Sequence, residues 1–202
     1  MEGRAVNVEE YKKELRRIVS ERRESITEDE VRQKSRAIFS RIAATEAYRR
    51  TDSIFIYVNF GHEVATREFI ERAWRDGKRV AVPKTGSHRQ MSFWYIRGFG
   101  QLKPSKFGIQ EPVTSFPGLV IPADDTKNAL MIMPGVAFDR DLHRIGYGGS
   151  FYDRYLKKHM DFTRYAVAFD FQIFEKVPYD LMDVPPQAIF TETQVITRRV
   201  NI

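Results

Sequence analysis

A glycine-rich segment lies between an apolar run and a helical pattern, and this order constrains the fold of the chain most. Residues 146–149 hold three glycines. The apolar residues 129–133 upstream end at a Pro-Gly pair, as a buried strand often does, and residues 151–158 downstream can form a helix. Because glycine lacks a Cβ, the backbone N–H groups of such a loop can surround an anion, above all a phosphate beside a helix N-terminus. The pattern predicts a strand, a loop and a helix around an anion site, with an ordinary surface turn as the alternative.

Two common phosphate-binding signatures are absent from the sequence. The Walker loop needs a Gly-Lys-Ser/Thr triplet, and none occurs. The dinucleotide fingerprint needs a third glycine at the position of Phe151 and a glycine loop that follows its strand directly, whereas residues 136–145 intervene here. The residues alone therefore leave phosphate binding and a plain turn equally open.

The composition fits a globular protein of one domain, or of one domain with an appendage. The chain has 202 residues, of which 42% are hydrophobic, and it has no cysteine. Disulfides and thiolate catalysis are therefore excluded, and a reducing compartment fits. No apolar stretch reaches the roughly eighteen residues of a membrane span, and residues 1–10 lack the apolar core of a signal peptide. We expect a cytoplasmic protein that does not bind a membrane.

The net charge of +6 suggests either a nucleic-acid partner or an anionic small ligand. The basic residues are not gathered into one block, because acidic residues are mixed among them in residues 1–50. Mixed signs are typical of solvated helix faces. We therefore expect no nucleic-acid partner.

Helical and strand patterns alternate along the chain, with a capping box at Thr27 and Glu30. Such alternation predicts an α/β domain with a mostly parallel sheet. Residues 98–128 are expected to be mainly loops. The expected helices are 8–23, 27–47, 66–75 and 151–158, and the expected strands are 53–58, 79–82 (stopped by Pro83), 91–96, 119–121, 129–133, 165–169 and 194–197.

Three segments follow expected strands at their carboxyl ends, where ligands of such sheets gather. They are residues 59–66, the glycine segment, and the residues after Phe169. We expect these segments to face one crevice.

Several short segments, spread over nearly the whole chain, follow one another in an unusual order and spacing. They are 12–16, 63–66, 107–112, 133–139, 144–149, 152–153, 155–156, Pro178, Asp183 and 191–192. In these segments the chain resembles the 5-formyltetrahydrofolate cyclo-ligase family, also called methenyltetrahydrofolate synthetases. The resemblance implies one domain over residues 1–202, with three layers around a mostly parallel sheet as in NagB/RpiA/CoA transferase-like folds. It also implies that the N-terminal helices, residues 8–47, pack on this core.

The resemblance implies a ligase that forms a C–N bond and uses ATP and Mg²⁺. 5-Formyltetrahydrofolate, free or polyglutamylated, would become 5,10-methenyltetrahydrofolate, with release of ADP and phosphate. Transfer of the γ-phosphoryl group makes the amide-like formyl oxygen a leaving group, which the attack of N10 expels. This chemistry needs mainly positioning and charge neutralisation from the protein. The resemblance is compatible with a monomer or a homodimer.

The family's motifs assign roles to the matching residues of this chain. The implied catalytic residues are Lys12, Arg16, Arg144 and Tyr152. The implied ATP-binding residues are Lys12, Lys13, Glu14, Leu15, Arg16, Arg144, Ile145, Gly146, Tyr147, Gly148, Gly149, Ser150, Phe151 and Tyr152. The implied folate-binding residues are Phe60, Glu63, Ala65, Tyr147, Gly148, Gly149, Ser150 and Phe151, and Asp153 and Asp183 would hold Mg²⁺.

Several of these residues could instead have plain structural roles. Lys12 and Arg16 lie four apart and share a helix face, which could simply be solvated. Asp153 could be an acid that the dipole favours in the first turn of a helix. Asp183 could be an ordinary loop acid, Glu63 a helix cap and Phe60 a core aromatic.

Four places depart from the family's motifs. Ala65 stands where the family has an acid that contacts the folate. Ser150 replaces a third glycine, Phe151 replaces a tyrosine, and residues 185–187 lack an acidic tail. The nucleotide half of the site therefore matches better than the folate half. Two other functions stay open: an ATP-using relative that acts on another formylated or amide-like substrate, and a basic binding module without catalysis.

Overall fold

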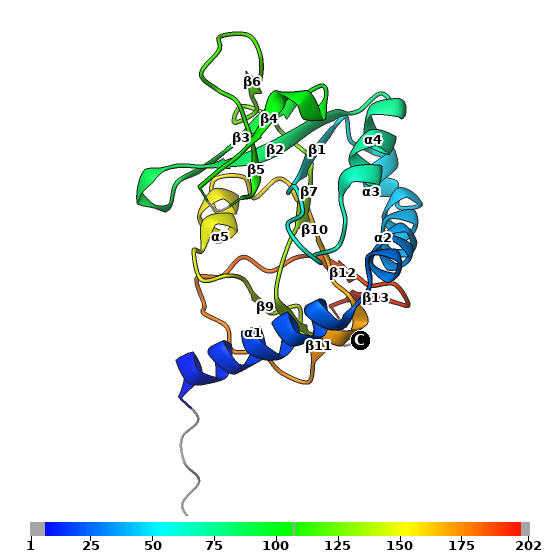
Figure 1. The fold of residues 1–202 in the computed structure, drawn as a ribbon, viewed down its shortest axis with the longest axis vertical. Coiled ribbons are helices and arrows are strands. Elements are labelled where there is room, and N and C mark those ends of the chain that lie inside the picture. Colours follow the sequence, from blue (N-terminus) through cyan, green and yellow to red (C-terminus); the bar gives the residue numbers. More distant parts are fainter. Residues whose placement is uncertain (1–6, 107, 199–202) are drawn as a thin grey trace, which may run out of the picture.

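The computed structural model describes residues 7–106 and 108–198 and contains an eight-stranded sheet (Figure 1). The strand order is β13-β12-β10-β7-β1-β2-β3-β6, and four of the seven neighbouring pairs, those among β12, β10, β7, β1 and β2, are parallel. The mostly parallel sheet is therefore confirmed. Its strands are β1 Ser53–Ile56, β2 Arg79–Thr85, β3 Met91–Ile96, β6 Ile121–Pro122, β7 Leu130–Met133, β10 Thr163–Val167, β12 Ala188–Phe190 and β13 Val195–Thr197.

Helices cover both faces of this sheet. Figure 1 shows α2, α3 and α4 on one side and α5 on the other. The helices are α1 Val8–Ser25, α2 Glu28–Ala43, α3 Glu46–Arg50, α4 Arg67–Arg75 and α5 Phe151–Leu156, with short 3-10 turns η1 Ser87–Arg89, η2 Phe99–Gln101 and η3 Asp170–Gln172. None of the helices in the described part of the chain is long and apolar enough to cross a membrane.

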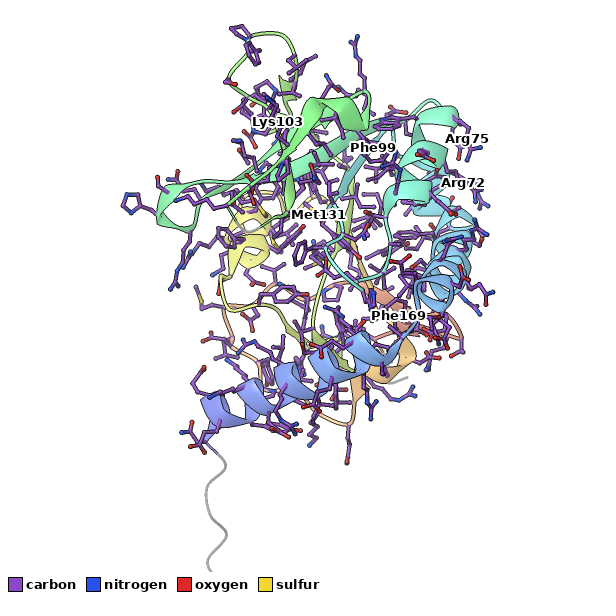
Figure 2. All side chains as sticks on the ribbon, in the orientation of Figure 1. Arg72, Arg75, Phe99, Lys103, Met131 and Phe169 are labelled. Carbon is purple, nitrogen blue, oxygen red and sulfur yellow. The ribbon has the colours of Figure 1, made fainter. Side chains whose placement is uncertain are left out.

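The side chains of β1 explain why both faces are covered. Ile54 and Ile56 belong to the hydrophobic cluster beneath α2 and α4, whereas Phe55 belongs to the cluster beneath α5. Alternating residues of a strand point to opposite faces, so a central strand that is apolar throughout needs a layer on each side. In Figure 2, the charged side chains of Arg72 and Arg75 lie on the outer side of α4, whereas the fully buried Met131 lies between the layers.

Helix α1 packs on a second, three-stranded sheet in the order β11-β8-β9. Leu15 is buried there against Ala137, Ile145 and Val177. The strands are β8 Ala137–Asp139, β9 Arg144–Ile145 and β11 Ile173–Phe174. The β8–β9 hairpin accounts for the residues that separate β7 from the glycine segment, and it brings α1 close to that segment (Figure 1).

Some predicted boundaries are wrong for identifiable reasons. The second helix ends at Ala43 and not at residue 47, because Thr45 accepts a bond from the Tyr48 N–H and begins the separate helix α3. Strand β2 continues through Pro83, which is tolerated because β1 pairs with β2 only as far as Ala81.

Short strands were also missed in the regions expected to be loops. A hairpin of β4 Leu102–Pro104 and β5 Gln110–Pro112 forms a two-stranded sheet within residues 98–128. The strands β8, β9, β11 and β12 have only two or three residues each, too few for a clear alternating pattern. Phe107, which belongs to a segment that resembles the family, lies outside the described residues, as do residues 1–6 of the expected polar terminus.

We predict that Gly135→Ala destabilises the fold. A Cβ at Gly135 would lie 2.2 Å from Cζ of the fully buried Phe138 ring, which has no space to move into. Overpacking of this kind should lower the free energy of unfolding by about 2 kcal/mol or more, as measured by urea denaturation. Gly98→Ala is the control, because a Cβ there meets no atom within 4 Å and the backbone is extended. Equal stability of the two variants would contradict the tight packing described here.

Candidate active site

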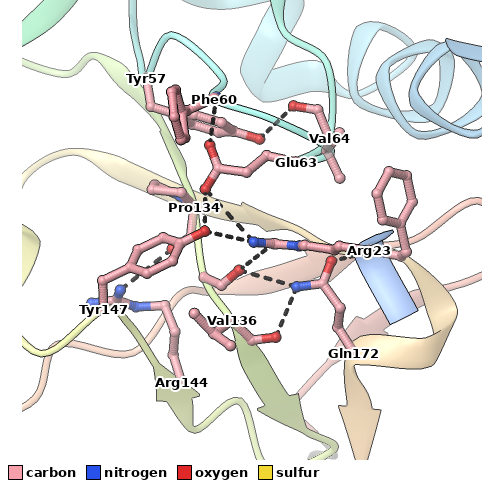
Figure 3. Close-up of polar contacts among 12 residues, drawn as sticks. Arg23, Tyr57, Phe60, Glu63, Val64, Pro134, Val136, Arg144, Tyr147 and Gln172 are labelled. Atoms are coloured by element: carbon pink, nitrogen blue, oxygen red, sulfur yellow. Dashed lines mark hydrogen bonds and ion pairs between the residues drawn. The ribbon is translucent and has the colours of Figure 1, made fainter. Parts of the chain in front are cut away.

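The three segments expected to share a crevice do meet at the carboxyl edge of the main sheet (Figure 3). The Tyr147 hydroxyl, in the glycine segment, donates to Glu63 Oε1 in the loop after β1 at 2.6 Å. Gln172, after β10, donates through Nε2 to the carbonyl oxygens of Gly135 and Val136 at 3.0 and 2.8 Å. Residues far apart in the sequence are therefore linked by hydrogen bonds at the ends of adjacent parallel strands.

Helix α1 contacts the glycine loop through Arg16. The Arg16 Nε donates to the Gly146 carbonyl oxygen at 3.0 Å. Gly148 has φ +98, a left-handed conformation that favours glycine, and a Cβ there would lie 3.8 Å from an Arg16 terminal nitrogen. The structure thus brings one predicted cation of α1 beside the predicted anion loop, as phosphate binding would require.

The other predicted residues of α1 are differently placed. Lys12 lies one turn before Arg16, is partly buried, and has its Nζ 3.5 Å from Glu9. Lys13 and Glu14 are exposed, and Glu14 accepts bonds from Arg17. Leu15 lies in the core below α1, so only its backbone could contact a nucleotide.

A buried ion pair joins the two ends of the glycine loop. Arg144 Nη2 lies 3.0 Å from Asp153 Oδ1, and the two side chains are only 8% and 13% exposed. Asp153 Oδ1 also accepts from the Val184 N–H at 3.1 Å, which draws the neighbouring Asp183 toward α5. Asp183 itself accepts from the Asp180 N–H. The backbone next to Asp183 thus contacts Asp153, the other predicted Mg²⁺ ligand, and one carboxylate oxygen of Asp153 is already engaged.

Tyr152 has a buried hydroxyl for which the described residues provide no hydrogen-bond partner. Burial is the main cause that raises the pKa of Tyr152 above its usual range, and the negative charge of Glu63 adds to the rise while Arg144 opposes it. The phenol therefore stays protonated at neutral pH. It can donate a hydrogen bond to a ligand but cannot act as a base.

The predicted folate residues are divided between the group of loops at the sheet edge and the core. Glu63 accepts from the Phe60 N–H at 3.0 Å, so it orders its own loop and does not cap α4. Phe60 is 54% exposed, which rules out a core aromatic at this position. Ala65 packs against the main core cluster, and its N–H donates to Ser35 of α2.

Burial of the Tyr147 hydroxyl raises the pKa of Tyr147, and the adjacent Glu63 raises it further. The residue as a whole is 66% exposed, so only the hydroxyl end is held inside the site. Ser150 begins α5 with φ 49 and makes no side-chain cap bond, so the serine at this position adopts the backbone that glycine favours.

Sequence reasoning missed Arg23 and Gln172. Arg23 Nη1 lies 2.5 Å from the Tyr147 hydroxyl, and Nη2 donates to the Gly135 carbonyl oxygen at 3.0 Å. Arg23 follows Arg16 by seven residues, so it lies on the same side of α1, and this spacing could have indicated it. Gln172 gave no comparable signal.

Two other features lie away from this crevice. A cavity of about 670 Å³ opens at the opposite, amino edge of the sheet, beside Ser53 and Arg79. Asp139, Asp141 and His143 place one ligand atom each within 4.8 Å of one another. However, Asp139 accepts from the N–H groups of Asp141 and His143 and from Val177, so it holds the β8–β9 turn together. The convergence of loops and cations at the carboxyl edge carries more weight than the cavity, because ligands of parallel sheets bind at that edge.

A model of the 5-formyltetrahydrofolate cyclo-ligase family matches residues 8–192 of the chain. The chain belongs to this family. The resemblance expected from the sequence is confirmed, and with it the expectation of an enzyme of the cyclo-ligase family.

Individual relatives of the cyclo-ligase family extend over most of the chain. A protein of Schizosaccharomyces pombe named probable 5-formyltetrahydrofolate cyclo-ligase is 29% identical over 199 residues, covering 92% of this chain and 97% of the relative. The 5-formyltetrahydrofolate cyclo-ligase of Escherichia coli K12 is 28% identical over 182 residues, covering 88% and 98%.

Solved structures of the family confirm the α/β fold. The 5,10-methenyltetrahydrofolate synthetase of Aquifex aeolicus matches with a TM-score of 0.78 at 28% identity, covering 95% of this chain and 94% of the other. A synthetase from Mycoplasma pneumoniae matches with a TM-score of 0.67 at 21% identity, covering 90% and 98%, and supports the fold alone.

We predict that Asp153→Asn lowers the free energy of unfolding by about 3 kcal/mol, because it leaves the buried Arg144 charge without its partner. Urea denaturation would measure the loss. The control is Glu68→Gln, which breaks the exposed pair of Arg36 and Glu68 and should change stability much less, since water and salt screen such pairs. If both variants are equally stable, the buried pair does not hold the ends of the glycine loop.

Proposed function

We propose that the chain, acting as one domain, converts 5-formyltetrahydrofolate to 5,10-methenyltetrahydrofolate with ATP and Mg²⁺, releasing ADP and phosphate. The observation that carries the proposal is the contact of Arg16 in α1 with the Gly146 carbonyl of the glycine loop. It joins a cation to a loop whose backbone leaves space for an anion, within a chain that belongs to the cyclo-ligase family.

The nucleotide side of the site fits a triphosphate. Gly148 presents no side chain at the turn, and Arg16 lies beside it. Lys12 adds a second cation one turn earlier on α1, and Arg144 adds a third at the start of the loop. Cations and backbone N–H groups fixed in this way can neutralise the charge that moves between phosphate oxygens during phosphoryl transfer. ATP supplies the phosphoryl group that turns the formyl oxygen into a leaving group.

The folate side of the site uses an aromatic face and a fixed carboxylate. Phe60 exposes its ring in the loop that carries Glu63, and a flat pterin could stack on this ring. Glu63 is held by Tyr147 and by the Phe60 N–H, yet each carboxylate oxygen retains capacity to accept N–H groups of a pterin. Tyr152 is protonated and could donate a hydrogen bond to the oxygen that leaves the formyl carbon as part of phosphate, where negative charge develops as the C–O bond breaks.

Asp153 and Asp183 remain our proposed Mg²⁺ ligands, because carboxylate oxygens suit this cation. Asp153 Oδ1 is shared by Arg144 and the Val184 N–H, so the remaining oxygen is the one available to the metal. The residues fit a cation held mainly by the substrate phosphates and only in part by the protein.

A second candidate is an ATP-using cyclo-ligase relative with another formylated or amide-like substrate. The observation that favours it is Ala65, which supplies no carboxylate beside Glu63 and packs on the core instead. Thermal shifts with ATP alone, with 5-formyltetrahydrofolate alone and with both separate the two, since a ligand that binds the folded state raises Tm. Stabilisation by ATP without any response to the folate would favour the second candidate.

We predict that Lys12→Ala and Arg16→Ala each lower kcat/KM for ATP by about 100-fold or more, because each removes a cation from the phosphates. The assay follows the absorbance of methenyltetrahydrofolate as it forms from 5-formyltetrahydrofolate and MgATP. Arg17→Ala is the matched control, since Arg17 lies next to Arg16 but pairs outward with Glu14 and Glu21. Wild-type turnover by Arg16→Ala would remove the basis of the proposal.

We predict that Tyr152→Phe lowers kcat without lowering stability. The buried hydroxyl has no partner among the described residues, so its removal relieves a desolvation cost and leaves Tm unchanged or raised. Turnover measured at saturating substrates, together with a melting curve, tests this. A variant that turns over at the wild-type rate would show that the hydroxyl takes no part in the reaction.

A further inference from the structure

Arg23, in the last turn of α1, is nearly buried and connects three parts of the site. Its side chain is 13% exposed. Nη1 contacts the Tyr147 hydroxyl of the glycine loop at 2.5 Å and lies 3.8 Å from Glu63 Oε1, while Nη2 donates to the Gly135 carbonyl oxygen at 3.0 Å. Figure 3 shows this guanidinium between Glu63, Tyr147 and Gln172.

The main chain of Arg23 is anchored to the same loop. The carbonyl oxygen of Arg23 lies 2.5 Å from Nδ1 of His62, the residue before Glu63. The loop after β1 is therefore attached to Arg23 through its backbone and through its side chain. Movement of the end of α1 would displace Glu63 and Tyr147 together.

Stability does not explain an arginine at this position. Arg23 Nε is buried, and the described residues offer it no acceptor. A buried N–H without a partner destabilises a fold, and burial of a charge adds to that cost. The planar guanidinium does, however, direct its two terminal nitrogens at once toward a hydroxyl and a carbonyl, which a lysine cannot do.

Arg23 holds Glu63, which is assigned to the folate alone, and the hydroxyl of Tyr147, a residue assigned to ATP through the loop backbone and also to the folate. The Tyr147 hydroxyl donates to Glu63, and Glu63 in turn accepts from the N–H of Phe60, the proposed stacking residue. Arg16, about two turns earlier in α1, makes the separate contact with Gly146. One helix thus supports the two halves of the site through different residues.

We propose that Arg23 is a positioning residue that fixes Tyr147 and Glu63 in the arrangement that binds the formylated pterin. This inference rests on the proposed function. Arg23 touches neither substrate, and it acts through Tyr147 and Glu63. Its loss should therefore weaken binding of the folate and leave binding of ATP unchanged.

Steady-state kinetics of Arg23→Gln test the proposal. The KM for 5-formyltetrahydrofolate should rise about tenfold or more, as expected when a binding group is slightly misplaced, while the KM for ATP stays within about twofold of wild type. Arg22→Gln is the matched control: Arg22 lies in the same turn and is exposed, and within the described residues its side chain hydrogen-bonds only to the Phe171 carbonyl oxygen. An equal rise in both KM values, or no rise in either, overturns the proposal.

A double-mutant cycle with Tyr147→Phe tests the route of the effect. If Arg23 acts through the Tyr147 hydroxyl, Arg23→Gln should raise the folate KM by less than about threefold in the Tyr147→Phe background, because coupled residues are not additive. The full tenfold rise in that background contradicts the route through Tyr147. If Arg23→Gln does not fold, Arg23→Lys keeps the charge but not the fork, and the same loss of folate affinity is expected from it.

Hydrogen exchange separates failure of this inference from failure of the proposed function. Wild-type protein that gives no product from 5-formyltetrahydrofolate overturns the function. Even then, peptides that cover residues 57–66 and 144–150 should exchange faster in Arg23→Gln than in wild type and Arg22→Gln, because the two loops lose their shared anchor. Unchanged exchange in both peptides overturns the positioning role whether or not the chain is active.

Discussion

The buried ion pair of Arg144 and Asp153 is the interaction on which the geometry of the glycine loop depends. Arg144 lies in β9, just before the glycine loop, and Asp153 lies in the first turn of α5, so the pair closes the loop between them. Without such a closure, a segment this rich in glycine would have much conformational freedom to lose on binding an anion. The glycines provide close backbone approach, and the ion pair limits the conformations in which they do so.

The rest of the site around that loop comes from three separate parts of the fold: the main sheet, the small sheet and α1. The sheet supplies the common edge at which the loops after β1, β7 and β10 meet. The small sheet supplies a platform for α1, and α1 supplies the cations. This division explains why one side of the crevice carries Arg16 and the other carries Glu63 and Phe60. In the proposed reaction, the phosphoryl donor and the flat folate would approach the same space from these two sides.

Strong local patterns in the sequence were sufficient to predict the α/β class, the long helices and the central strands. The capping box at Thr27 and Glu30 is present as predicted. The sequence could not define strands of two or three residues, because pairing with neighbours and not local preference determines them. Pro83 inside β2 is an example: only the partner strands show that its missing N–H is not needed.

The candidate site, too, could be predicted from the sequence only in part. The glycine loop and the alignment of Lys12 with Arg16 followed from spacing, whereas the role of Arg23 did not, because its partners Tyr147 and Gly135 are more than a hundred residues away. The engagement of Asp153 with Arg144 was equally hidden. Polar contacts of this kind depend on the finished packing and leave no periodic trace in the sequence.

The docking of α1 joins segments of the chain that are synthesised at very different times. Arg16 meets a carbonyl 130 positions later in the chain, and the surface beneath Leu15 is made of residues of β8 and β9. During synthesis the first helix therefore leaves the ribosome long before its platform exists. The parallel sheet can begin to assemble in that interval. The glycine loop gains the positive charge of Arg16 only when α1 packs onto β8 and β9, which are synthesised much later.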